Sequence, residues 1–466
     1  MSNNIKFGTD GWRAVIGVDF TASNLISVAD ATLMYLIKRN PKPVVLVGYD
    51  CRFNGKLFAQ ITATRLAQNG AKVLLTPGFV STPMVSLATV QRRADMGIIL
   101  TASHNPPEYL GFKLKGPYGG PAYPSVIEEI ETYIGVQNDF ANGDFETLLS
   151  NGSIEYYDAE ALYINHLKSS FSIDAMRGSG VKIAYDAMYG AGRKVLSKVF
   201  PDAHLIHCDN NPGFNGRAPE PIGKNLPELR EYCKSNKIPF GLATDGDADR
   251  IGLYDDRGVF IDSHHIMLLV ANYLLREKKM TGKIVSTFSC TDKIKKFAQI
   301  NGLPFEVTKI GFKYIAEIMA AERVLVGGEE SGGIAVAGHI PERDGIYIGL
   351  LVLEMMAKSG KNISELISDI YNEVGEFAVE RNDLHLSEED KARIVSECPN
   401  YRKFGPYMVQ SLEDLDGFKY RFGDDKWVMI RPSGTEPVLR VYAEAESSTF
   451  ANDILFHTLN TITHKS

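Results

Sequence analysis

One stretch of the chain decides the fold class, and it reads Met96-Gly97-Ile98-Ile99-Leu100-Thr101-Ala102-Ser103-His104-Asn105-Pro106. The apolar run at its start has the length of a buried strand, and the polar residues that follow are typical of a turn. Enzymes of the α/β class hold their chemistry on loops at the carboxyl ends of such strands. We therefore take Ser103, next to His104, as a candidate reactive hydroxyl. A turn without chemistry is the alternative at this point.

An apolar run followed by an unusual loop occurs three times along the chain. Short apolar runs open the three segments at residues 44–48, 181–185 and 283–287, and a second run in each segment leads into a loop. The loops are the serine loop (residues 101–106), the aspartate loop (residues 245–250) and the glutamate loop (residues 327–333). Helical patterns lie between the runs, and this alternation predicts mainly parallel sheets. We predict three related α/β domains with mixed, mainly parallel sheets.

The last part of the chain differs in character from the first three segments. A long helical pattern runs from Ile346 to Tyr371, and after Gly375 a polar stretch leads to two apolar runs and a terminal helical segment. This pattern predicts a smaller C-terminal α+β domain. A segment rich in Asn, Gly and Asp at residues 142–154 marks the first break between domains. The predicted domains are residues 1–148 with the serine loop, 149–256 with the aspartate loop, 257–374 with the glutamate loop, and 375–466.

Composition and charge exclude several classes of protein. Of the 466 residues, 44% are hydrophobic and 23% are charged, which is close to average for a globular chain. The formal net charge is −7, and the absence of a Lys/Arg-rich block argues against nucleic-acid binding. No apolar run approaches the ~18 residues that span a bilayer, and residues 1–10 lack the apolar core of a secretion signal. We expect a cytoplasmic protein that binds neither nucleic acid nor membranes.

The aspartate loop carries carboxylates at alternate positions, Asp245, Asp247 and Asp249, directly after an apolar run. Adjacent carboxylates repel one another unless a cation neutralises them, so this loop is a candidate metal site, with a solvated acidic turn as the alternative. A calcium loop of the EF-hand type needs Gly at loop position six and Glu at position twelve, but these positions hold Arg250 and Asp256. With so few protein ligands, Mg²⁺ completed by phosphate oxygens is the expected ion.

Two further loops offer groups suited to a phosphosugar. The arginine loop (residues 431–437, Arg-Pro-Ser-Gly-Thr-Glu-Pro) combines a guanidinium, hydroxyls and backbone N–H groups, which suits a phosphate. The glutamate loop offers Glu329 and Ser331 on a glycine-rich backbone, which suits sugar hydroxyls. Each loop taken alone is also consistent with an ordinary turn. Nucleotide binding is not indicated, because the chain has no G-x-x-x-x-G-K-[ST] motif.

Taken in order, five motifs resemble those of the α-D-phosphohexomutase superfamily, whose members include phosphoglucomutases and phosphomannomutases. They are Gly8-Thr9-Asp10-Gly11-Trp12-Arg13, the serine loop with Gly111-Phe112-Lys113, the aspartate loop, residues 328–333 of the glutamate loop, and the arginine loop. These motifs are spread over nearly the whole chain. The resemblance implies four domains around one central active-site cleft and a phosphosugar substrate. We expect a monomer or a homodimer.

The resemblance also implies a role for each matching residue. Ser103 is implied to be the phosphorylated nucleophile and donor, and one of its phosphate oxygens binds one Mg²⁺ together with Asp245, Asp247 and Asp249. The implied reaction is a double transfer that interconverts hexose 1-phosphate and hexose 6-phosphate. Phospho-Ser103 gives its phosphate to the free hydroxyl of the sugar, and the other phosphate of the resulting hexose 1,6-bisphosphate, which is both intermediate and activator, returns to Ser103. The arginine loop is implied to hold the phosphate that is not reacting. The implied substrate-binding residues are Arg250, Lys313, Glu329, Ser331, Arg431, Ser433, Gly434 and Thr435.

Proton transfer has two candidate carriers. We assign it to Lys113, because a crowded cleft can tune the pKa of an ammonium group, whereas the pKa of Arg13 is too high for an easy base. Arg13 then stabilises negative charge together with Lys113 and Arg250. His104, beside the nucleophile, is the competing proton carrier, and we assign it the support of the serine loop.

Departures from the superfamily's patterns bear on the preferred hexose, which the sequence leaves open among glucose, mannose and glucosamine. Gly333 stands where members that act on both glucose and mannose phosphates often carry His, which favours glucose phosphates. The arginine loop is also similar to that of phosphoglucosamine mutases, so a phosphoglucosamine mutase is the alternative within the same chemistry. A non-catalytic sugar-phosphate-binding relative is the alternative from a different class, although the nucleophile, carboxylates and basic residues are all retained.

Overall fold

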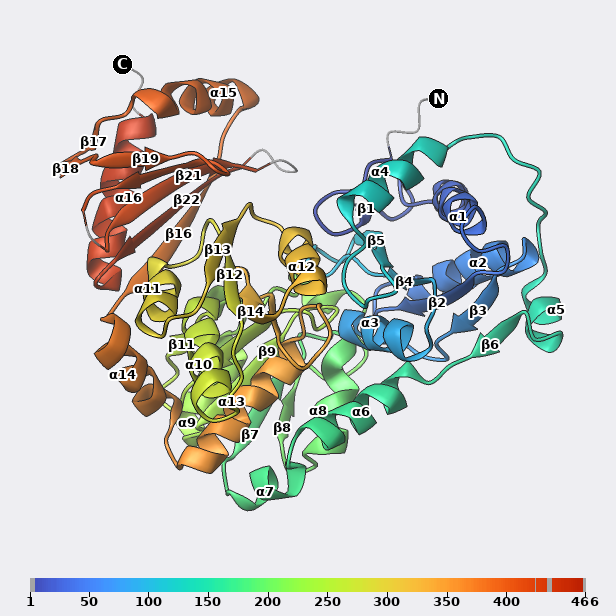
Figure 1. Cartoon of the computed structure of the whole chain (residues 1–466), viewed down its shortest axis with the longest axis horizontal. Coiled ribbons are helices and arrows are strands. Elements are labelled where there is room, and N and C mark those ends of the chain that lie inside the picture. The colour runs from blue at the N-terminus through green and yellow to red at the C-terminus, as the bar shows by residue number, and fades with distance from the viewer. Residues whose placement is uncertain (1–4, 424, 434–437, 464–466) are drawn as a thin grey trace. The chain divides into compact units, whose positions relative to one another are not determined.

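The structure is a computed structural model that describes residues 5–423, 425–433 and 438–463 (Figure 1). The chain divides into two compact units. The first unit contains the chain up to Gly282 together with Gly311–Glu365, and the second unit contains Lys283–Ile310 and the chain from Leu366 onward.

The first sheet of the first unit contains six strands. Their order across the sheet is β1 (Trp12–Val15), β5 (Tyr109–Lys115), β4 (Met96–Leu100), β2 (Val44–Tyr49), β3 (Lys72–Leu75) and β6 (Ile154–Tyr156). The neighbours from β4 to β6 pair in parallel, whereas β5 pairs antiparallel with both β4 and β1. The helices of this region are α1 (Ala22–Ile37), α2 (Gly55–Gln68), α3 (Thr82–Gln91), α4 (Pro124–Tyr133) and α5 (Phe145–Ser150).

Helices cover both faces of this sheet. Val47 belongs to a hydrophobic core that includes Phe58 of α2, whereas a side chain at the next residue, Gly48, would meet Val85 of α3. Successive residues of a strand point to opposite faces, so α2 and α3 lie on opposite sides of β2. This explains why β2 is apolar along its whole length, as parallel strands buried on both faces are.

The second sheet of the first unit contains five strands. Their order is β11 (Phe260–Ile261), β10 (Ile251–Tyr254), β9 (Phe240–Thr244), β7 (Ile183–Asp186) and β8 (His204–Ile206). β8, β7 and β9 pair in parallel, and β10 pairs antiparallel with both β9 and β11. The helices in this part of the chain are α6 (Ala159–Ser170), α7 (Ile173–Gly178), α8 (Val195–Val199) and α9 (Pro227–Asn236).

The remaining part of the first unit carries the glutamate loop. β14 (Val324–Gly328) and β15 (Ile334–Val336) pair antiparallel, and the helices are α10 (Ser263–Arg276), α12 (Phe312–Ala321) and α13 (Gly345–Ser359). The serine, aspartate and glutamate loops therefore share one setting, because each connects the end of a buried strand to an antiparallel neighbour. This repeated hairpin explains why the same pattern of apolar run and polar loop occurs three times in the sequence.

One predicted helix is interrupted. The helical pattern from Ile346 to Tyr371 was expected to be continuous, but α13 ends at Ser359 and α14 (Ile363–Val374) follows it. Gly360 caps α13 with a left-handed backbone (φ 70°), and its N–H donates to the carbonyl of Met356. Glycine adopts this conformation at little cost, so it ends the helix even though the apolar periodicity continues beyond it.

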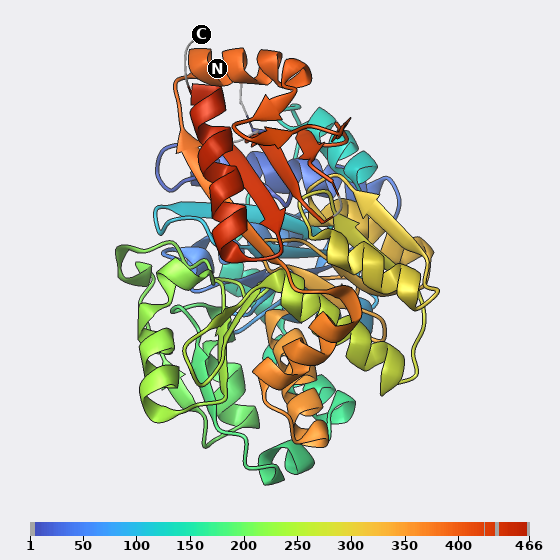
Figure 2. The same cartoon turned by 90° about the vertical axis from the view of Figure 1, so that its left-hand side faces the viewer.

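The second unit contains the C-terminal sheet. Its strand order is β16 (Ala378–His385), β22 (Val438–Ala445), β21 (Trp427–Pro432), β20 (Phe418–Arg421) and β19 (Ser411–Glu413), and all its pairings are antiparallel. Helix α16 (Ser448–Thr463) packs on β16 and β22, as Figure 2 shows in red. The unit also contains β12 (Lys283–Thr287) paired in parallel with β13 (Phe305–Thr308), helices α11 (Asp292–Ile300) and α15 (Glu388–Glu397), and the short hairpin of β17 (Lys403–Phe404) and β18 (Tyr407–Met408).

These sheets confirm the predicted fold class, with mixed, mainly parallel α/β domains followed by a smaller α+β domain. The predicted runs at residues 44–48, 96–100 and 283–287 form β2, β4 and β12. None of the helices in the described part of the chain combines the length and apolarity that crossing a bilayer requires.

Candidate active site

Ser103 follows β4 in a left-handed conformation, with φ 51°, and is almost fully buried. Its N–H donates to Thr101 Oγ1 over 2.9 Å, and the hydroxyl of Thr101 in turn donates to Asp50 Oδ2 over 2.5 Å. The Ser103 hydroxyl donates to Asp245 Oδ2 over 2.7 Å. The structure therefore brings the serine loop and the aspartate loop into direct contact.

The guanidinium of Arg52 holds the serine loop in place. Arg52 Nε lies 3.3 Å from Asp50 Oδ2, and both side chains are fully buried. The guanidinium donates to backbone carbonyls over 2.6–3.0 Å, namely those of Ser103, Asn105, Pro106 and Tyr109. The sequence interpretation missed Arg52, although Asp50-Cys51-Arg52 is a charged pair placed directly after the apolar run of β2.

His104 lies beside the nucleophile candidate, with Nδ1 3.4 Å from Ser103 Oγ. Burial lowers the pKa of His104 well below its ordinary value, and the positive charges of Arg250 and Arg13 lower it further. The imidazole is therefore neutral at physiological pH.

The three carboxylates of the aspartate loop converge. Asp245, Asp247 and Asp249 are completely buried, and each offers one oxygen within 4.8 Å of the other two. Burial, with repulsion from the other two carboxylates, raises the pKa of Asp245 well above its ordinary value. Asp247 Oδ1 and Asp249 Oδ1 are buried without a hydrogen-bond partner among the described residues. Buried, unpartnered oxygens on converging carboxylates are suited to a divalent cation.

Lys113 lies against the same carboxylates. Its Nζ is 2.8 Å from Asp247 Oδ2, 3.2 Å from Asp249 Oδ2 and 2.7 Å from Asp10 Oδ2. Burial alone would lower the pKa of Lys113, but the carboxylates of Asp10, Asp247 and Asp249 outweigh it and raise the pKa above its ordinary value. Asp10 was not singled out from the sequence, although it belongs to the Gly8–Arg13 motif.

Two guanidinium groups approach from other strands. Arg13 of β1 donates from Nη1 to Asn105 Oδ1 over 2.7 Å, which ties β1 to the serine loop. Arg250 directly precedes β10, and its Nη1 lies 3.7 Å from Glu220 Oε1. Arg250 Nε is buried and makes no hydrogen bond to any described residue, so it retains a donor for an anion.

The glutamate loop places one carboxylate in the first unit's interior. Glu329 is 5% exposed, and its Oε1 accepts from the N–H of Gly311 over 3.0 Å. Burial raises the pKa of Glu329 to about 7, although the Arg343 guanidinium opposes the shift. Ser331 is half-buried. Lys313, on α12, lies with residues 7–11 around a cavity of about 210 Å³.

The arginine loop belongs to the second unit. Arg431, in β21, lies with Nε 3.3 Å from Asp416 Oδ1. The N–H of Ser433 donates to the carbonyl of Val438 over 2.9 Å, and the carbonyl of Ser433 accepts from Lys391 Nζ over 3.0 Å. The other predicted residues of this loop, Gly434 and Thr435, lie outside the described residues.

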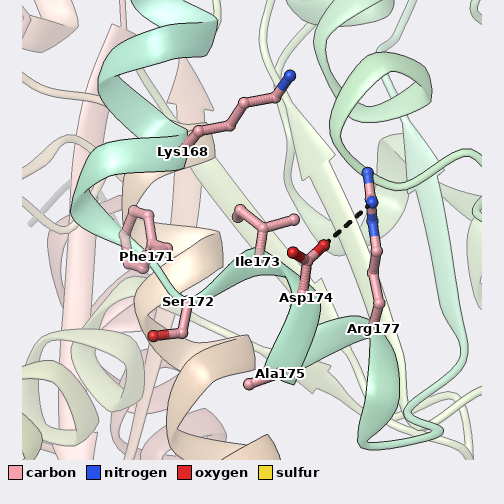
Figure 3. Close-up of a pocket in the computed structure, with 7 residues that line it drawn as sticks. All are labelled: Lys168, Phe171, Ser172, Ile173, Asp174, Ala175 and Arg177. Atoms are coloured by element: carbon pink, nitrogen blue, oxygen red, sulfur yellow. Dashed lines mark hydrogen bonds and ion pairs between the residues drawn. The ribbon is translucent and has the colours of Figure 1, made fainter.

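A different pocket opens on the surface near α6 and α7, with a volume of about 520 Å³ (Figure 3). Its charged groups include an ion pair between Arg177 and the almost fully exposed Asp174, at 3.4 Å. None of the predicted site residues lines it. The convergent, buried groups lie at the three loops instead.

Comparison with known families covers nearly the whole chain. Four family models match in order, each described as phosphoglucomutase/phosphomannomutase: alpha/beta/alpha domain I at residues 4–139, domain II at 161–258, domain III at 262–374, and the C-terminal domain at 385–455. A phosphoglucomutase/phosphomannomutase of Thermococcus kodakarensis is 32% identical over 460 residues, which is 96% of each chain. A probable phosphoglucosamine mutase of Methanosphaera stadtmanae is 30% identical, also over 96% of each chain.

A solved structure supports the same grouping. The putative phosphomannomutase of Thermus thermophilus is 32% identical to this chain, with a TM-score of 0.87 and full coverage of both chains. The four matched models and these relatives agree on one kind of enzyme, an isomerase that moves phosphate on a hexose. The chain belongs to the phosphoglucomutase/phosphomannomutase family within the α-D-phosphohexomutase superfamily.

Proposed function

We propose that this phosphohexomutase interconverts the 1-phosphate and 6-phosphate of glucose, and of mannose, through phosphorylated Ser103 and a hexose 1,6-bisphosphate. The observation that carries the proposal is the hydrogen bond from Ser103 Oγ to Asp245, one of three buried, converging carboxylates, of which the other two contact Lys113. A hydroxyl in this setting is suited to carrying a phosphate beside a divalent cation.

The charges of the site support a bound Mg²⁺. A phosphoserine adds about −1.5 to −2 charges next to three carboxylates, so its attachment needs local positive charge. We propose that Asp245, Asp247 and Asp249 hold one Mg²⁺ together with an oxygen of phosphorylated Ser103. The unpartnered Oδ1 atoms of Asp247 and Asp249 fit this donor set. When bound, Mg²⁺ would neutralise the carboxylates and polarise the transferred phosphoryl group.

Different residues of the chain are proposed to serve different parts of the phosphate transfer. The bond between phosphorus and Ser103 Oγ breaks as a bond forms to the free hydroxyl of the sugar monophosphate, and the reverse transfer from the other end of the bisphosphate restores phosphoserine. Arg13 and Arg250 stabilise the charge on the phosphoryl oxygens.

Lys113 is proposed to carry the hydroxyl proton, with His104 as the competing group. The carboxylates of Asp247 and Asp249 raise the pKa of Lys113, and a bound Mg²⁺ would offset that effect and ease release of the proton.

The remaining predicted residues are proposed to bind the sugar phosphate. Glu329 and Ser331 hold the sugar hydroxyls in both orientations, and Lys313 provides a further sugar-facing cation. The phosphate that is not reacting is held by the arginine loop, through Arg431, Ser433, Gly434 and Thr435. Binding at two ends fixes the in-line geometry that phosphoryl transfer requires.

Phosphoglucosamine mutase is the second candidate function. Relatives named phosphoglucosamine mutase or probable phosphoglucosamine mutase are 29–31% identical to the chain, against 32% for the Thermococcus kodakarensis phosphoglucomutase/phosphomannomutase. Gly333, in place of a histidine of the superfamily pattern, supports glucose phosphates as the first choice.

The comparison of three substrates tests both candidates. The ratio kcat/KM is measured for glucose, mannose and glucosamine 1-phosphates with Mg²⁺ and a hexose 1,6-bisphosphate activator. We expect glucose 1-phosphate to give the highest value and mannose 1-phosphate the next. A preference of about tenfold or more for glucosamine 1-phosphate would establish the second candidate. Binding of all three substrates without turnover would identify a non-catalytic relative.

A further inference from the structure

Arg343 is a buried guanidinium two residues before the start of α13, and the sequence alone does not single it out. It is 3% exposed and faces four carboxylates. Its Nη2 pairs with Asp10 Oδ2 and also lies 2.7 Å from Asp249 Oδ2. Its Nη1 lies 3.9 Å from Glu329 Oε2, and its Nε donates to Glu342 Oε1 over 3.4 Å. A buried guanidinium is costly unless it is paired, and these carboxylates supply the pairing.

Two of these carboxylates are shared between Arg343 and Lys113. Asp10 Oδ2 contacts the guanidinium and also lies 2.7 Å from Lys113 Nζ. Asp249 Oδ2 lies 2.7 Å from Arg343 Nη2 and 3.2 Å from Lys113 Nζ. Both cations therefore engage the same oxygen of Asp249, and the oxygen that stays without a hydrogen bond is Oδ1. The contact with Arg343 therefore constrains the orientation of the Asp249 carboxylate.

The side chain of Arg343 fills the space that a side chain at position 333 would need. A Cβ at position 333 would lie 2.4 Å from Arg343 Cδ and 3.1 Å from its Cγ, whereas its next contact, Glu329 Oε2, is at an ordinary 3.5 Å. The φ of Gly333 lies outside the left-handed region, so the backbone itself would accept a side chain there. The space at position 333 is occupied by the side chain of Arg343.

We infer that Arg343 is a positioning residue for phosphoryl transfer, which orients Asp249 and the Lys113–Asp10 pair, and that position 333 is glycine to admit it. The inference rests on the proposed function of the site. Arg343 acts through its neighbours, so its loss should displace Lys113 and Asp249 while the glutamate loop and the arginine loop still bind substrate.

The first test separates turnover from binding in variants of Arg343. Arg343→Met should lower kcat about 100-fold, the size of effect that a displacement of about 1 Å produces, with KM changed by less than about threefold. Arg343→Lys should recover about tenfold of that loss, because an ammonium can still pair with one of the two shared carboxylates. The exposed Arg177→Met is the matched control, with kcat expected to be unchanged. Values of kcat are expressed per folded enzyme, with folding measured by circular dichroism at the assay temperature.

The second test is a double-mutant cycle between positions 333 and 343. Gly333→Ala should lower kcat about 100-fold in the natural chain, but by less than about threefold when it is added to Arg343→Ala, because the obstructing side chain is then absent. An equal loss in both backgrounds would overturn the steric pairing. A kcat of Arg343→Met within about threefold of the natural enzyme would overturn the positioning role. If the natural enzyme turned over no hexose phosphate, the proposed function would be wrong. The steric pairing could then still be tested by measuring the unfolding midpoints of the same four proteins of the double-mutant cycle.

Discussion

At the scale of single residues, we propose that Ser103 carries a phosphate rather than acting with a neighbouring base. Its left-handed backbone costs a non-glycine residue about 1–2 kcal/mol, and the surrounding hydrogen bonds hold it there. The hydroxyl donates to Asp245 over 2.7 Å, whereas His104 Nδ1 is 3.4 Å away. The strongest contact of the hydroxyl is therefore with the proposed metal site.

Substitution of Lys113 tests the proton carrier. Lys113→Met should lower kcat about 10²–10⁴-fold, the usual range for a general acid or base, with a much smaller change in sugar-phosphate affinity. Lys113→Arg should be similarly slow, because arginine keeps the charge but does not exchange a proton readily. His104→Asn should cost less than either. Steady-state kinetics and substrate titration of each variant measure these effects.

Two outcomes would show that Lys113 does not carry the proton. Near-normal turnover of Lys113→Arg would show that the ammonium provides charge alone. A larger loss in His104→Asn than in Lys113→Met would assign the proton to His104.

The sequence was informative for residues that directly follow an apolar run. Ser103 and the three aspartates stand at such positions, and the structure brings them together. Asp10, Arg52 and Arg343 were not identified, because their roles depend on contacts across the fold. Arg52 reaches Ser103 across 51 positions of the sequence, and Arg343 reaches Asp10 across 333. A local sequence pattern does not predict contacts between residues so far apart in the chain.

At the scale of elements, the strand-loop-strand hairpin is the unit that positions the site. The serine, aspartate and glutamate loops each end a buried strand and lead into an antiparallel one. Strands of this kind were predictable from their apolar runs, whereas the break between α13 and α14 was not. Apolar residues keep a helical spacing on both sides of Gly360, and a single glycine is tolerated within a helical pattern.

Substitution of Gly360 tests the assignment of this helix end. Gly360→Ala should destabilise the protein by about 1 kcal/mol, since its φ of 70° disfavours any residue with a Cβ although the space around it is open. Gly178→Ala is the matched control, because Gly178 is equally open but has no left-handed φ. Urea denaturation of the three proteins gives the comparison. Equal midpoints for the two variants would be inconsistent with a left-handed cap at Gly360.

At the scale of the whole molecule, the chain is acidic, with a formal net charge of −7, yet it is proposed to bind an anionic phosphosugar. The positive charge is local: Arg13, Lys113 and Arg250 gather at the loops of the first unit. The order of the α/β domains was predictable, because each repeats the same alternation of strands and helices. The detailed pairing of buried charges was not, since it depends on the folded chain.

Buried charge also gives the second unit a pH dependence. Burial and the neighbouring Asp292 raise the pKa of Glu444 from an ordinary 4.5 to about 7. Between these values the folded state binds more protons at Glu444 than the unfolded state, so the stability that this group contributes is fully present below about pH 4.5 and is lost as pH rises toward 7. The shift corresponds to roughly 3 kcal/mol for this group. Glu444→Gln should remove this decrease, because glutamine stays neutral.

Fluorescence of Trp427 can follow this effect, since its Nε1 donates to Glu444 Oε2 over 2.8 Å. The other of the two tryptophans, Trp12, is replaced by Phe so that the emission reports the second unit. Urea titrations at about pH 5 and about pH 7.5 are compared with and without the Glu444→Gln substitution in this background. The same pH slope in both proteins would contradict the assignment.

The central claim, that Ser103 is the phosphate carrier, is tested most directly by mass spectrometry of the protein after incubation with glucose 1,6-bisphosphate and Mg²⁺. We predict one phosphate on the peptide that contains Ser103, none on the Ser103→Ala protein, and loss of mutase turnover in that variant. An unmodified Ser103 together with full activity of Ser103→Ala would contradict it.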